Sequence, residues 1–109
     1  MSFSKQEIRD KALRILKLLA TGQPAVPEHA QIVDDVVDAA QAFLESKGIA
    51  YWPANEIPNG AADGFRNYVA ARAAPELPGA EVVTSEAQAL RDLYEFTATK
   101  NGRVAFTYF

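Results

Sequence analysis

The chain has 109 residues, a formal net charge of −3 at pH 7 and no cysteine. This length suits one domain, the missing cysteines exclude disulfides and zinc–thiolate sites, and the acidic balance argues against a general affinity for nucleic acid. No apolar run approaches the roughly 18 residues of a membrane span, and the first ten residues lack the pattern of a signal peptide, so we expect a protein made in the cytoplasm with no membrane partner.

Two amphipathic helices are predicted in the first half of the chain. Ser4 and Glu7 match a capping box, and the apolar residues that follow recur at helical spacing, which predicts a helix over residues 4–20. A second helix is predicted over residues 28–47, ended by Gly48. The polar side chains expected on its outer face are Gln31, Asp34, Asp35, Asp38, Gln41 and Glu45.

The middle of the chain is predicted to be a loop, because residues 49–64 are rich in proline and glycine. Tyr51 and Trp52 are expected to hold this loop against the core. A third helix is predicted over residues 61–73, since Pro75 disfavours a helical residue directly before it.

The last helix is predicted to begin at a second capping-box pattern, Ser85 with Gln88, and to end before Gly102. The residues beyond it are mainly β-branched and aromatic, which favours an extended conformation. We therefore predict an all-α fold: a single domain resembling a four-helix bundle (residues 1–102), followed by an extended C-terminal docking tail (residues 103–109).

Asp34, Asp35 and Asp38 match the DDxxD pattern of the magnesium–diphosphate sites of isoprenoid synthases. Asp34 and Asp38 share a helix face, but such a site also needs a large helical cage with a second acidic cluster, for which this chain is too short. We interpret these acids as a solvated face. The single histidine, His29, and the scattered glycines form no catalytic pair or phosphate loop, so we expect no catalytic, cofactor-binding or metal site and no enzymatic activity.

The outer face of the first predicted helix is locally basic, with Lys5, Arg9, Lys11, Arg14 and Lys17. Such a face could contact DNA or an acidic partner. A solvated face with ion pairs inside the helix is the interpretation we favour.

The predicted tail is unusually apolar for a terminal segment, which is more often polar. It could fold back on its own domain, it could be disordered, or it could add to another chain as a strand or a plug. Its seven residues would reach about 23 Å when extended. We favour docking on another chain, and the expected partner interface consists of Arg103, Val104, Phe106, Tyr108 and Phe109.

Five segments in this order carry a family resemblance: SFSKQEIRDKALRILKLLATGQ, VDDVVDAAQAFLESKGI, IPNG, NYVAARAAPEL and EAQALRDLY. The chain resembles the small helical head-completion proteins of tailed bacteriophages, also called adaptors, head–tail connectors or packaged-DNA-stabilisation proteins. The resemblance covers roughly residues 4–98.

This resemblance implies a ring of copies, usually twelve, beneath the portal protein of the virion, assembled in the host cytoplasm. Such a ring extends the DNA channel, retains the packaged DNA through transient non-specific contacts and provides the platform for a downstream tail protein. By the same resemblance, residues 103–109 would reach into the portal, and Asp34, Asp35 and Asp38 would face the channel. The alternative is a small helical scaffold or regulatory subunit of a bacterial complex, with an isoprenoid-type enzyme a distant third.

Overall fold

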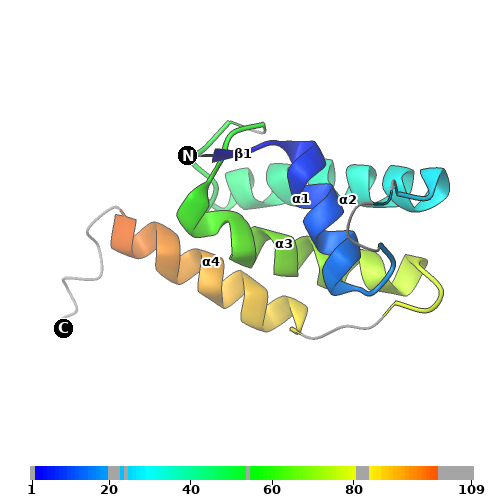
Figure 1. The fold of residues 1–109 in the computed structure, drawn as a ribbon. Helices are drawn as coiled ribbons and strands as arrows, with labels where there is room; N and C mark the ends of the chain where they lie inside the picture. The colour runs from blue at the N-terminus through cyan, green and yellow to red at the C-terminus, as the bar shows by residue number, and fades with distance from the viewer. Residues whose placement is uncertain (1, 20–22, 24, 54, 81–83, 101–109) are drawn as a thin grey trace.

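The computed structural model describes residues 2–19, 23, 25–53, 55–80 and 84–100. In this part of the chain there are four α-helices, as predicted, together with a short 3-10 helix and two short strands (Figure 1). The elements are β1 (Ser2–Phe3), α1 (Lys5–Ile15), α2 (Pro27–Ser46), β2 (Ile57–Pro58), α3 (Asn59–Ala73), η1 (Ala74–Glu76) and α4 (Glu86–Lys100).

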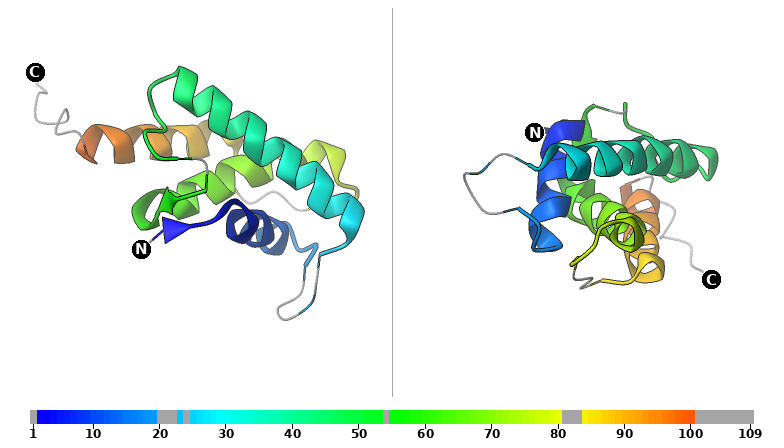
Figure 2. Two further views of the ribbon diagram at one scale, coloured as in Figure 1. Left: turned by 90° about the horizontal axis from the view of Figure 1, so that it is seen from above. Right: turned by 90° about the vertical axis from the view of Figure 1, so that its right-hand side faces the viewer.

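Helix α3 is the centre of the fold. Helices α1, α2 and α4 all pack against it and surround it on three sides (Figure 2, right). The largest fully buried side chains come from every one of these helices, so the core is continuous. They are Ile8, Leu13, Leu16, Val33, Val37, Leu44, Ile57, Phe65, Tyr68, Val69 and Leu93.

The first helix begins as predicted. The Ser4 hydroxyl accepts a hydrogen bond from the Glu7 amide (3.2 Å), and the Glu7 carboxylate accepts one from the Ser4 amide (2.8 Å), which completes the capping box. At α4 only half of the predicted box forms, because the Gln88 side chain donates to Asp92 Oδ1 instead of reaching back to Ser85.

Helix α1 ends at Ile15, five residues earlier than predicted. The amide of Leu18 donates to the carbonyl of Leu13 (2.9 Å), and that of Lys17 donates to the carbonyl of Arg14 (3.0 Å), which is a Schellman motif. Lys17 therefore has a left-handed backbone, with φ of 66°. The tight turn replaces the last predicted turn of helix.

The same motif closes α2, but there glycine occupies the left-handed position. The amide of Ile49 donates to the carbonyl of Leu44 (2.9 Å), and Gly48 has φ of 73°. The expected end of the second helix at Gly48 is thus correct, and the two motifs differ mainly in having Lys17 or Gly48 at the equivalent position.

This difference leads to a prediction. Lys17→Gly should raise the free energy of unfolding by about 0.5–1 kcal/mol, because the left-handed conformation costs a non-glycine residue about 1–2 kcal/mol and glycine's greater loss of entropy offsets part of that gain. Gly48→Ala should have the opposite effect, since no atom lies within 4 Å of the added Cβ and backbone strain alone remains. Urea unfolding of both variants tests the pair; a destabilising Lys17→Gly would contradict it.

Two features, one at the start of the chain and one in α2, depart from expectation. Ser2 and Phe3 pair antiparallel with Pro58 and Ile57, a connection that was not predicted. Gln41 is buried, with 5% of its surface exposed, so its assignment to the polar face of the second helix is wrong.

Gln41 is buried because its side-chain amide pairs with Trp52. Trp52 Nε1 donates to Gln41 Oε1 (3.0 Å), and Gln41 Nε2 donates to the Trp52 carbonyl (3.1 Å). Trp52 is 3% exposed and holds the loop on the core as expected, whereas Tyr51 is 48% exposed. The side-chain amide of Gln41 and the indole N–H and carbonyl of Trp52 therefore satisfy each other's hydrogen bonds inside an otherwise apolar contact.

Candidate functional site

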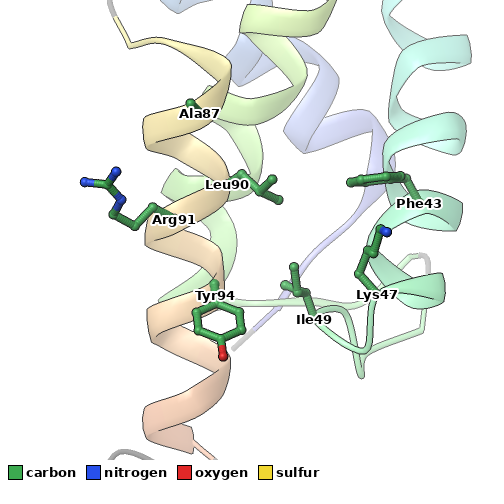
Figure 3. A pocket seen from close by; sticks show the side chains of 7 residues that line it. All are labelled: Phe43, Lys47, Ile49, Ala87, Leu90, Arg91 and Tyr94. Carbon is green, nitrogen blue, oxygen red and sulfur yellow. The ribbon is translucent and has the colours of Figure 1, made fainter.

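A groove of about 470 Å³ lies between the C-terminal part of α2 and helix α4 (Figure 3). Phe43, Ile49 and Leu90 point toward one another across it. Lys47 borders it on the α2 side, and Arg91 extends from the outer edge of α4. The remaining lining residues are Ala87 and Tyr94.

The groove follows from how α2 and α4 are held. Both helices pack along α3, and the space between them is left open. At one end the segment after α2 meets α4, where the Thr97 hydroxyl donates to the Ile49 carbonyl (2.6 Å) and the Tyr51 ring stacks on Phe96 with centroids 6.4 Å apart. The groove is therefore part of the fixed fold, anchored beside Ile49.

The chemistry of the groove is that of a binding surface for an apolar segment. Tyr94 is 62% exposed and Phe43 is 36% exposed, although both are large aromatic residues. Lys47 Nζ lies 5.6 Å from the centroid of the Phe43 ring, a cation–π distance. Exposed aromatic rings beside cationic side chains are typical of the residues that dominate protein–protein binding.

Tyr68 lies under this region, where its ring stacks on Phe43 with centroids 6.4 Å apart. Burial raises the pKa of the Tyr68 phenol above its ordinary value of 10.0, and the Arg72 guanidinium partly opposes this shift. The folded chain thus favours the neutral phenol more than the unfolded chain does.

The raised pKa predicts alkaline destabilisation. Below pH 10 the neutral phenol is present in both states and the stability contribution is complete; as the pH rises past 10, the unfolded chain loses its proton first and stability falls until the folded-state pKa is passed. Tyr68→Phe should therefore lose less stability between pH 9 and pH 11 than the unchanged chain in urea unfolding. Tyr94→Phe, at an exposed position, is the control and should leave the alkaline loss in place.

Two of the three candidate aspartates pair with the basic face of α1. Arg9 Nη1 lies 3.4 Å from Asp34 Oδ2, and Lys5 forms an ion pair with Asp38. Asp35 instead accepts a hydrogen bond from Gln31 Nε2 (2.9 Å) on its own helix. The acidic and basic faces thus partly neutralise each other between α1 and α2. Within α1, Arg9 Nε also pairs with Asp10 Oδ1 (3.0 Å), so the expected ion pairing inside the first helix is present alongside the pairs between helices.

In the part of the chain that the structure describes, no group of three histidine, cysteine, aspartate or glutamate side chains is placed to hold a metal ion. His29 lies in the first turn of α2, as expected. No helix of the described residues is both long and apolar enough to cross a bilayer.

The predicted partner interface, Arg103, Val104, Phe106, Tyr108 and Phe109, lies outside the described residues. The groove was not predicted, because the helical spacing of Leu90, Leu93 and Tyr94 does not say which of these side chains another helix covers. The sequence does contain a pattern that indicates the groove, because the apolar residues of α4 cover more than one helix face. Ala89 and Leu93 are buried, and Leu90 and Tyr94 lie beside them.

Comparison with models of protein families, with curated proteins and with solved structures gives no match for this chain.

Proposed function

We propose that the chain is a head–tail connector, or adaptor, of a tailed bacteriophage, which forms a ring under the portal, extends the DNA channel, retains packaged DNA and provides the platform for tail attachment. The observation that carries this proposal is the order of structural elements. The segments on which the family resemblance rests fall at defined points of the fold: Gly48 and Ile49 close α2, Ile57–Pro58 forms β2 directly before α3, and Ala74–Glu76 ends it.

The surface chemistry supports assembly as the mode of action. The groove between α2 and α4 presents Phe43 and Tyr94 to solvent. Such a surface suits a subunit that contacts neighbouring copies, because a small domain buries a smaller share of its apolar area by itself. In such a ring, twelve copies would surround the channel. The acidic residues Asp34, Asp35 and Asp38 would then repel DNA and let it slide, although Lys5 and Arg9 reduce their net charge.

A scaffold or regulatory subunit of a bacterial complex is the second candidate. The exposed groove favours it equally, because an apolar groove serves any assembly. The two candidates differ in their partner: only a connector binds a portal protein.

Portal binding by the tail tests the proposed function. Deleting residues 103–109 should weaken binding to the cognate portal protein by about 100-fold or more, because several aromatic anchors are lost together. Calorimetric titration of the portal with the full chain and with the shortened chain measures the change. Matching backbone amide signals of α1 in the two chains are the control for folding. Unchanged affinity would contradict the anchoring role, and a full chain that does not bind the portal would contradict the connector function.

A further inference from the structure

The groove between α2 and α4 lies close to where the C-terminal segment leaves the fold. Helix α4 ends at Lys100, and Tyr94 and Ala87 precede this end by six and thirteen residues. At 1.5 Å per residue they lie about 9 Å and about 20 Å back along the helix axis. Residues 103–109 would span about 23 Å as an extended strand. A segment that reversed direction at Asn101 and Gly102, a common turn pair, would therefore reach the whole groove.

The side chains of this segment match the groove in spacing. If residue 103 were level with the end of α4, residue 106 would lie about 10 Å back and residue 108 about 17 Å back. Tyr94 and Leu90 lie at about 9 Å and about 15 Å on the same scale. Phe106 and Tyr108 alternate onto the same side of a strand, so both would face the groove at the levels of Tyr94 and Leu90.

The two surfaces also share an aromatic character. Residues 103–109 contain three aromatic side chains, and the groove offers the partly exposed rings of Phe43 and Tyr94. Lys47 already lies 5.6 Å from the Phe43 ring and could hold a second ring by the same cation–π attraction. A tethered segment also acts at a high effective concentration, which favours its own groove over that of another copy.

We propose that, in the free subunit, the groove lined by Phe43, Ile49, Leu90 and Tyr94 binds residues 104–109 of the same chain, antiparallel to α4. This binding requires no portal, so it goes beyond the proposed function and does not depend on it. A partner that takes the tail must displace it from the groove, which keeps the aromatic side chains covered until then.

A spin label on the tail tests the proposal in the full chain. The chain contains no cysteine, so Thr107→Cys gives a single attachment site for a nitroxide, on the side of the strand facing away from the groove. The backbone amide signals of Ile49, Leu90 and Tyr94 should broaden relative to the reduced, diamagnetic sample, whereas that of Ile8, in α1, should not. A mixture of nitroxide-labelled chain and unlabelled ¹⁵N chain should show no broadening, because the contact lies within one molecule.

Two tyrosine variants provide the matched comparison. Tyr94→Ser removes an exposed ring from the groove and should reduce the ratio of docked to free tail about tenfold. Tyr94→Phe keeps this ring and removes only its hydroxyl, so it should leave the broadening intact. Unchanged α1 signals in both variants show that they fold. Broadening in the mixed sample would mean that the tail binds a second copy, and no broadening in either sample would mean that the groove does not bind the tail; either result overturns the proposal.

Discussion

Replacing Gln41 with alanine is expected to lower the free energy of unfolding by about 3 kcal/mol. The change leaves Trp52 Nε1 and the Trp52 carbonyl buried without the hydrogen bonds of 3.0 Å and 3.1 Å that Gln41 now provides. Each buried polar group left unsatisfied costs about 1–3 kcal/mol. Because Trp52 packs against Phe65 in the core, with ring centroids 6.2 Å apart, the loop cannot easily turn these groups to solvent.

A second glutamine on the same helix gives the control. Gln31 donates to Asp35 at the exposed surface (2.9 Å), so Gln31→Ala should change stability by less than about 0.5 kcal/mol. Both alanines remove a glutamine from α2, so a difference between them measures burial and not helix propensity. Urea unfolding followed by Trp52 fluorescence measures both variants. Similar effects at the two positions would show that the Trp52 hydrogen bonds contribute little.

The Gln41 result also illustrates what the sequence could predict and what it could not. Helical spacing and capping residues are local signals, and they identified four helices, the cap at Ser4 and the end of α2 at Gly48. Gln41 has a polar side chain at a position whose burial depends on Trp52, eleven residues later and across a chain reversal. No local pattern contains that contact.

The candidate surfaces show the same contrast between local patterns, which the sequence reveals, and contacts between helices, which it does not. The sequence placed Asp34 and Asp38 on one helix face, but their pairing with Arg9 and Lys5 depends on how α1 packs beside α2. The groove likewise depends on α2 and α4 both packing against α3. These features follow from tertiary packing, which overrides what each helix indicates by itself.

The position of α4, and with it the groove, depends on two glycines of α3. Gly60 and Gly64 stand one turn apart on the face of α3 that α4 covers. A Cβ at Gly64 would lie 3.2 Å from Leu93 Cδ2, and one at Gly60 would lie 2.5 Å from Phe96 Cε1. Helix α4 therefore approaches α3 closely because these positions carry no side chain.

Gly64→Leu should consequently lower the free energy of unfolding by about 2–3 kcal/mol, because a leucine cannot fit beside the buried Leu93 without moving α4. Leucine favours a helix over glycine by roughly 0.8 kcal/mol, so a loss of stability must come from packing. Hydrogen exchange should show the amides of α4 losing protection more than those of α1. Asp63→Leu, at the neighbouring exposed position, is the control and should change stability by less than about 0.5 kcal/mol. Unchanged protection in α4 would mean that this contact does not position the groove; loss of protection would make Gly64 the residue on which the α4 wall of the groove depends.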